Sequence, residues 1–291
     1  MKWEPRGPSE DLEDRRGEDE ASAGGGGRGG IRIGLGGLAL LAVLSLATGR
    51  NFFSLLDTGV VSVDTGDGPA REHAAPAPGE DQLVQFVSFV IDDVQATWEK
   101  TLGDRYEHTR LVLFRDATRS GCGEAETGMG PFYCPVDRKV YIDLGFYDEL
   151  KRRFGAPGDF AQAYVLAHEI GHHVQNLLGV LPKVHAAEER DPDQANALSV
   201  RLELQADCLA GVWGHSTEQR QILEAGDVEE ALGAAAAVGD DRIQKQATGS
   251  VHRETWTHGS ARQRVAWFRR GLDAGDVASC DTFGTQLPED R

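Results

Sequence analysis

The stretch that decides the fold runs from Asp159 to Gly179 and reads DFAQAYVLAHEIGHHVQNLLG. Its apolar residues recur at helical spacing. Asp159 is followed three residues later by Gln162, the pattern of a capping box at a helix start. Gly179 is a natural C-terminal stop. The stretch therefore predicts one helix.

Within this helix, His168 and His172 are four residues apart. They project from one face, one turn apart, so both imidazoles can bind the same tetrahedral Zn²⁺ ion. Glu169 follows the first histidine, where its carboxylate can reach a zinc-bound water. The alternative is an ordinary helix with two surface histidines. The helix signals and a total of only nine histidines favour the zinc site.

A catalytic zinc needs a third protein ligand and an open position. A second helix, predicted from Asp191 to Trp213, carries Glu203 and Asp207 on one face. One carboxylate can bind the metal, and the other can accept a hydrogen bond from a ligand histidine. The alternative is an exposed acidic pair on an amphipathic helix.

A third helix is predicted to begin at Ser260, with Gln263 closing a capping box and Gly271 as its stop. His258 lies just before it and could donate to an oxyanion or help to bind substrate. The alternative is a simple helix entry. His173 points away from His172 and is expected to be structural or exposed.

The rest of the domain adds a helix over 81–100 and short strands over 111–114 and 140–144. We therefore expect an α+β fold, mainly helical, with a small antiparallel sheet. The strand over 140–144 is a candidate for pairing with an extended substrate.

The four cysteines form an even set, as expected for two disulfides in an oxidising compartment. Cys122 and Cys134 flank a glycine-rich loop that can bring its ends together, which leaves Cys208 to pair with Cys280. The alternative is four buried free thiols. No short C-x-x-C spacing indicates a structural zinc site.

The N-terminal part is expected to lie outside the folded domain of residues 81–291. Residues 1–30 are polar and glycine-rich and predict a disordered cytoplasmic tail. The apolar run 31–48 predicts a single transmembrane helix, and 49–80 a linker. Arginines concentrate before the run, which predicts a cytoplasmic N-terminus and an extracytoplasmic domain. A signal peptide cleaved after Ala47 and a buried core helix are the alternatives.

The net charge of −17 and the pI near 4.9 argue against nucleic acid as a partner, because an acidic surface repels phosphates.

Several blocks resemble a bacterial family of neutral zinc metallopeptidases. They are, in order, RGGIRIG from Arg28, SGCG from Ser120, GPFYCP from Gly130, VYID from Val140, HEIGHHVQ from His168, ELQADCLAGVW from Glu203 and THGS from Thr257. The resemblance implies a zincin fold, an N-terminal membrane anchor and peptidase activity. The Glu-x-x-x-Asp block also resembles that of membrane-linked and heat-shock-type gluzincin peptidases, which implies that Glu203 is the third ligand and Asp207 orients a histidine.

We expect a membrane-anchored zinc peptidase that acts on peptides or proteins. Glu169 would be the general base, with His258 or Tyr164 helping at the oxyanion. Two alternatives are a zinc-stabilised scaffolding module without turnover and a zinc hydrolase acting on a non-peptide amide. The absence of a recognisable wall-binding module disfavours the latter.

Overall fold

The computed structural model describes residues 1–17, 31–33, 61–63, 80–126, 130–152 and 155–288. The chain divides into two units, Met1–Arg16 with Pro76–Arg291, and Gly17–Ala75. In the second unit, the described residues form two strands paired in parallel, β2 (Ile31–Ile33) and β3 (Val61–Val63).

The predicted transmembrane helix over 31–48 lies mostly outside the described residues, and its first three residues form β2 instead of a helix. Among the described residues, no helix combines the length and apolar character needed to cross a bilayer.

The first unit is mainly helical, with one four-stranded sheet and one hairpin. Its α-helices are α4 (Glu80–Leu102), α5 (Gly145–Arg152), α6 (Asp159–Leu177), α7 (Val180–Arg190), α8 (Ala195–Gln219), α9 (Asp227–Ala237), α10 (Asp240–Thr248) and α11 (Ala261–Ala274). Short 3₁₀ turns span Gly103–Arg105, Pro192–Gln194, Arg253–Thr255 and Val277–Cys280. The strands are β1 (Leu12–Asp14), β4 (Arg110–Phe114), β5 (Ala117–Ser120), β6 (Gly123–Glu126), β7 (Phe132–Cys134) and β8 (Lys139–Asp143).

The four-stranded sheet has the order β1-β4-β8-β7 and is mixed. β1 and β8 both run parallel to β4, and only β7 runs antiparallel to its neighbour β8. The prediction of a small antiparallel sheet was therefore wrong. β8, the strand expected to pair with substrate, has a neighbour on each side. The edge strands of this sheet are β1 and β7, and an edge strand is where a further chain can pair.

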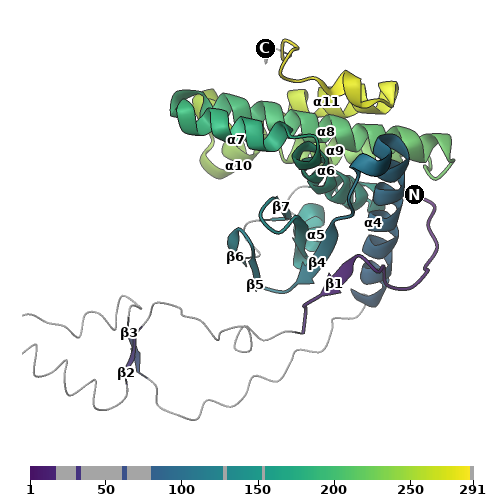
Figure 1. Cartoon of the computed structure of the whole chain (residues 1–291), viewed down its shortest axis with the longest axis horizontal. Coiled ribbons are helices and arrows are strands. Elements are labelled where there is room, and N and C mark those ends of the chain that lie inside the picture. The colour runs from purple at the N-terminus through teal and green to yellow at the C-terminus, as the bar shows by residue number, and fades with distance from the viewer. Residues whose placement is uncertain (18–30, 34–60, 64–79, 127–129, 153–154, 289–291) are drawn as a thin grey trace, which may run out of the picture. The chain divides into compact units, whose positions relative to one another are not determined.

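Residues 1–16, which we call the N-terminal strap, are part of the first unit (Figure 1). β1 pairs with β4, and the ring of Trp3 packs edge-on against Phe86 of α4 at 5.3 Å. The Met1 amino group lies 2.8 Å from Asp159 Oδ1 at the start of α6. The expected disordered tail was thus wrong for residues 1–17, because the strap has tertiary partners that its polar composition does not reveal. Residues 18–30 lie outside the described part.

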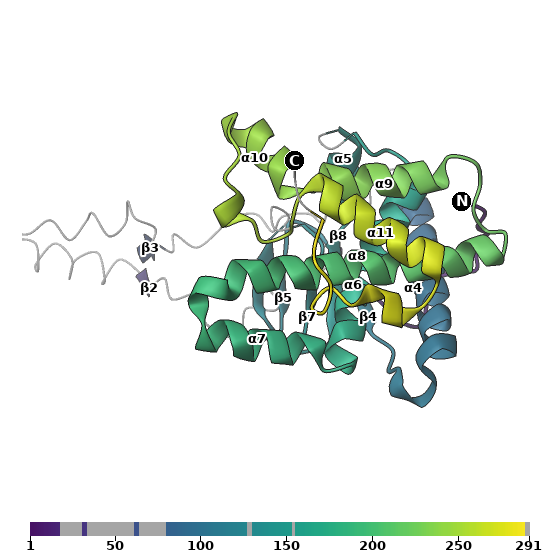
Figure 2. The same ribbon diagram turned by 90° about the horizontal axis from the view of Figure 1, so that it is seen from above.

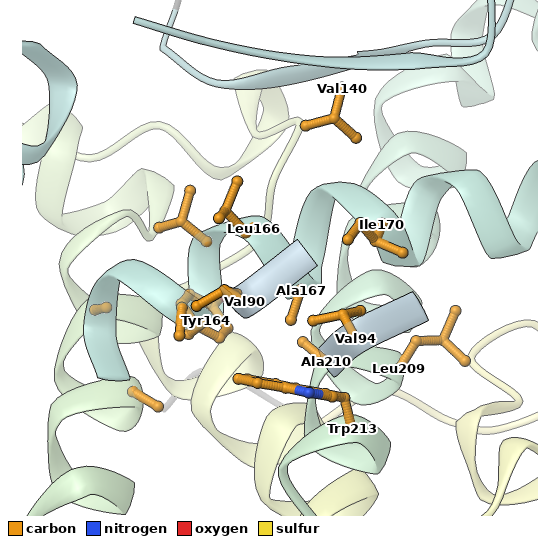
Figure 3. Packing of buried hydrophobic residues seen from close by; sticks show 14 of the residues in the cluster. Val90, Val94, Val140, Tyr164, Leu166, Ala167, Ile170, Leu209, Ala210 and Trp213 are labelled. Atoms are coloured by element: carbon orange, nitrogen blue, oxygen red, sulfur yellow. The ribbon is translucent and has the colours of Figure 1, made fainter. Parts of the chain in front are cut away.

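The core surrounds α6. Figure 3 shows Ala167 and Ile170 of α6 close to Val94 of α4, Val140 of β8 and Trp213 of α8. Nearly every residue of α6 from Phe160 to Gln175 is buried. A polar side chain on such a helix needs a partner inside the protein.

α8 and α11 lie in close contact (Figure 2), and two glycines permit it. A Cβ on Gly211 would lie 2.1 Å from the carbonyl oxygen of Phe268, and one on Gly271 1.9 Å from that of Cys208. Gly271 is therefore a packing residue, and the prediction that it ends the helix was wrong. α11 continues to Ala274, with Gly275 as its left-handed C-cap.

The predicted helix starts have mixed outcomes. The capping box of Ser260 and Gln263 is present at α11. Asp159 is the first residue of α6, Gly158 is the N-cap, and no side chain caps it. Asp191 ends α7, and its side chain makes no cap hydrogen bond to the following turn.

Two disulfides connect the first unit, Cys122 with Cys134 and Cys208 with Cys280, as the sequence indicated. The first joins the β5–β6 hairpin region to the edge strand β7, and the second joins α8 to the turn after α11.

Candidate metal centre

His168, His172 and Glu203 meet between α6 and α8. Their ligand atoms lie within 4.8 Å of one another. Nε2 of His168 is 3.2 Å from Oε2 of Glu203, and Nε2 of His172 is 3.4 Å from Oε1. Gly171 permits the approach, since a Cβ there would lie 3.1 Å from the carbonyl oxygen of Ala206. The structure thus brings together all three predicted ligands.

His168 is oriented by Asp207, which is fully buried. Nδ1 of His168 is 2.9 Å from Oδ1 of Asp207. A carboxylate can only accept, so Nδ1 carries a proton, and Nε2 is the ring nitrogen that faces Glu203 and the metal position. The Tyr164 hydroxyl donates to the same Asp207 oxygen. Its one proton is therefore engaged by Asp207, which argues against the expected help of Tyr164 at the oxyanion.

Arg264 of α11 holds Asp207 in place. Its Nε donates to Oδ2 at 2.8 Å and its Nη2 to Oδ1 at 2.9 Å. This bidentate pair compensates a carboxylate that would otherwise be buried as an isolated charge. From the sequence, Arg264 was expected only to lie in the third predicted helix. Its available signal was a basic side chain among the apolar residues of that helix.

His172 is oriented by Gln175, a residue that the sequence patterns did not single out. The Gln175 amide nitrogen donates to the Leu202 carbonyl at 2.7 Å and to Gln205 Oε1 at 3.1 Å, so its oxygen is the acceptor toward His172. Nδ1 of His172 donates to it at 2.8 Å, which leaves Nε2 free to bind a metal. The i, i+3 spacing of His172 and Gln175 was the signal available in the sequence.

The electrostatics of the cluster suit a cation. Burial disfavours the ionised carboxylate of Glu203, but the two imidazoles outweigh it and hold the pKa well below its usual range. Burial likewise disfavours a charged His168, yet Asp207 and Glu203 raise the pKa of His168 to about 10. Two imidazole nitrogens and one carboxylate match the ligand set of a catalytic zinc.

Glu169 lies beside the cluster and is 8% exposed. Burial raises the pKa of its carboxyl, with the nearby imidazoles opposing that shift. A carboxylate with a raised pKa is a better proton acceptor than an exposed one.

The cluster opens into a cavity of about 500 Å³. The cavity lining comes from β7, α5, α6, α7, α8, α11 and loops beside the helices and strands: Gly130, Pro131, Phe132, Tyr133, Pro135, Phe146, Tyr164, Val165, His168, Glu169, His172, Leu181, His185, Glu188, Ser199, Leu202, Glu203, Val238, His258 and Arg264. The predicted ligands, Glu169 and His258 therefore share one cavity.

His258 stands at the mouth of this cavity, and its side chain is 51% exposed. Asp240, at the start of α10, holds its loop by accepting the backbone N–H groups of Thr257, His258 and Gly259. A hydrogen bond to Asp240 raises the pKa of His258, against the effect of burial. No sequence pattern had pointed to Asp240.

His173 belongs to the core and not to the cluster. It is fully buried, with Nδ1 3.0 Å from the Tyr133 hydroxyl and Nε2 2.7 Å from the Glu107 carbonyl oxygen. Of the two expectations for His173, the structural one holds.

Comparison with known proteins agrees with this geometry. A family model described as "Putative neutral zinc metallopeptidase" matches residues 1–283, and the chain belongs to that family. The uncharacterized protein YpfJ of Escherichia coli K12 is 46% identical over 293 residues, covering 99% of this chain and 100% of YpfJ. The uncharacterized protein Mb2605 of Mycobacterium bovis is 48% identical over 203 residues, covering 66% of this chain and 68% of Mb2605. No solved structure matches the chain.

Proposed function

We propose that the protein is a zinc-dependent peptidase that hydrolyses peptide bonds with an activated water molecule. The observation that carries the proposal is the convergence of His168, His172 and Glu203 beside Glu169 in one cavity. The family match supports zinc as the metal.

Each residue near the cluster has a role that follows from its contacts. A bound zinc ion would supply a Lewis acid and lower the pKa of a coordinated water to about 7. Glu169 accepts the proton of the attacking water and delivers it to the leaving amine. His258, charged through Asp240, donates to the developing oxyanion. Asp207 and Gln175 keep both histidines in the tautomer that binds metal.

The substrate that suits this cavity is an extended peptide. β7 lines the cavity and is an edge strand of the sheet, the position at which an extended peptide can add as a further strand. Phe146, Val165 and Leu181 add apolar surface for side chains next to the scissile bond.

We also propose that the first unit works outside the cytoplasm. The support is its two disulfides, which persist in oxidising compartments. The apolar composition of residues 31–48 supports an association with a membrane.

The test compares wild type with Glu169→Gln in the full zinc-loaded chain, using denatured casein as the substrate and measuring zinc content in parallel. We expect cleavage by the wild type, loss of at least about a hundredfold in the variant, and about one zinc per chain in both. Equal cleavage by both would contradict the role of Glu169. Zinc binding without any cleavage of casein or of a random peptide library would favour a scaffolding module.

A further inference from the structure

The contact between β7 and α6 links the substrate edge to the metal helix. β7 lies beside α6, and its residues alternate between the two faces of the sheet (Figure 1). Cys134 packs in a small cluster on the far face, whereas Tyr133 faces α6. Tyr133 is the β7 side chain that reaches the helix carrying the ligands.

Three hydrogen bonds connect Glu107, His173, Tyr133 and Asn176 at this contact. The Glu107 carbonyl can only accept, so Nε2 of His173 carries the proton. Nδ1 of the same ring lies 3.0 Å from the Tyr133 hydroxyl, within hydrogen-bond distance. Asn176 in turn donates to that hydroxyl oxygen at 2.9 Å. Tyr133 is therefore held by two residues of α6, His173, which directly follows His172, and Asn176, which lies one turn after it.

We propose that His173 and Asn176 are positioning residues, which hold Tyr133 and so set the distance of β7 from the metal ligands. This inference rests on the proposed function. An edge strand binds a peptide through several backbone hydrogen bonds, each sensitive to shifts of a few tenths of an ångström. A peptide paired on β7 places its scissile carbonyl at the metal only if β7 is fixed to α6.

The experiment compares two metal-binding probes on the full zinc-loaded chain by calorimetry. Acetohydroxamate reaches the metal alone, whereas tetraalanine hydroxamate also extends along β7. In Tyr133→Phe we expect the Kd for the tetrapeptide probe to rise about tenfold and the Kd for acetohydroxamate to stay within about twofold.

Tyr141→Phe is the matched control. Its hydroxyl donates to Asp137 on the turn that leads into its own strand β8, and its ring packs on the far face of the sheet. The control loses the same group with a similar effect on stability, and both Kd values should remain those of the wild type.

Two substitutions of His173 separate positioning from mere support of the core. The amide of His173→Asn overlays Nδ1 and keeps the contact to Tyr133, whereas that of His173→Gln overlays Nε2 and keeps the contact to Glu107. We expect His173→Asn to bind the tetrapeptide probe more tightly than His173→Gln. In Tyr133→Phe, an equal change in Kd for both probes, or no change in Kd for either probe, would overturn the proposal. If the wild type binds neither probe, the proposed function fails and this proposal fails with it.

A second inference follows independently from the N-terminal strap. β1 pairs with β4 through Leu12, Glu13 and Asp14, and the family model also begins at residue 1. Two strands of one sheet must lie in the same aqueous compartment. A chain that crossed a bilayer once at 31–48 would put them on opposite sides.

We infer that the strap lies on the same side of any membrane as residues 80–288, because β1 and β4 belong to one sheet. The expected single crossing with a cytoplasmic N-terminus does not fit this inference. The described cysteines are all in disulfides, so a single added cysteine can report its location.

The test places a cysteine at Arg6 in the strap or at Glu254 in the main part of the first unit, both exposed. Intact cells producing each full chain are treated with a membrane-impermeant maleimide before and after lysis. We expect the same labelling pattern for Arg6→Cys and Glu254→Cys. Labelling of only one of them in intact cells would overturn the inference.

Discussion

Arg264 is the residue on which the orientation of His168 depends most, because it neutralises Asp207 inside the protein. Removing one partner of a buried ion pair costs about 3–5 kcal/mol. We therefore expect Arg264→Met to lower the free energy of unfolding by about that amount.

The milder Arg264→Lys keeps a charge but loses the two-point contact. We expect its zinc affinity to fall about tenfold to a hundredfold, measured by competition with a chelator. Arg262→Met, at an exposed position of α11, is the control. It should change neither the free energy of unfolding nor the zinc affinity. Wild-type zinc affinity in Arg264→Lys would show that Asp207 does not need its guanidinium partner.

His258 gives the site a pH dependence whose sign follows from its raised pKa. The imidazolium is present below that pKa and is lost as the pH rises through it, so its donation to the oxyanion disappears on the alkaline side. We expect kcat to decline there, at a pH above the ordinary histidine value.

His258→Gln should lower kcat roughly a hundredfold and remove this alkaline decline. His252→Gln, at an exposed histidine of the preceding loop, should keep the wild-type kcat and the alkaline decline. A pH profile of His258→Gln that keeps the alkaline limb would assign that limb to another group.

At the scale of elements, the close packing of α8 on α11 brings Arg264 to Asp207. Gly271→Ala would place a methyl group 1.9 Å from the Cys208 carbonyl oxygen, so the helices must separate. We expect destabilisation of about 1–3 kcal/mol or more, together with weaker zinc binding.

Gly233→Ala in α9 is the matched control for this substitution. Nothing lies within 4 Å of its added Cβ, so the same change should stabilise the helix by about 0.5–1 kcal/mol. Denaturant unfolding and chelator competition measure both effects. Unchanged zinc affinity in a destabilised Gly271→Ala variant would show that the packing of α8 on α11 does not affect the metal site.

His108, in the loop before β4, connects the strap to α4, because its ring lies 2.6 Å from Asp11 and 2.9 Å from Glu99. Burial opposes the charge, but these carboxylates raise the pKa of His108. Its contribution is complete below the unfolded value of about 6.5 and is lost as the pH rises through the folded pKa. Because the ring is partly exposed, we expect it to be below about 1 kcal/mol.

The measurement is the Tm of wild type and His108→Gln at pH 6 and pH 9. The difference should be visible at pH 6 and vanish at pH 9. A difference that grows with pH would mean that the neutral ring, and not the imidazolium, stabilises the strap.

At the scale of the whole molecule, the two disulfides constrain very different lengths of chain. Cys208 and Cys280 are 72 residues apart, whereas Cys122 and Cys134 are 12 apart. In the chain-entropy model the first contributes about 4 kcal/mol and the second about 3 kcal/mol.

We expect Cys208→Ala with Cys280→Ala to lower the Tm more than Cys122→Ala with Cys134→Ala does. The double variant Cys208→Ala with Cys280→Ala should also bind zinc more weakly, because Cys208 directly follows Asp207 in α8. Thermal unfolding and zinc titration of the two double variants test this. The reverse order of Tm values would show that local contacts of the hairpin outweigh loop length.

The sequence alone determined the features that depend on neighbours along the chain. Helical periodicity puts His168, Glu169 and His172 on one turn, and it does the same for Glu203 and Asp207. Capping chemistry located the start of α11 at Ser260. These patterns are local, so they can be read without knowing the partner elements.

Only the tertiary structure decided which distant groups meet. Arg264 lies 57 residues after Asp207, and Tyr133 lies 40 residues before His173. The prediction that residues 1–16 are disordered was wrong for the same reason, because the few apolar residues of the strap are buried against distant elements such as α4 and β4. Composition tells how much apolar surface a segment carries. Whether the segment is ordered depends also on the elements that pack against that surface, and only the tertiary structure shows them.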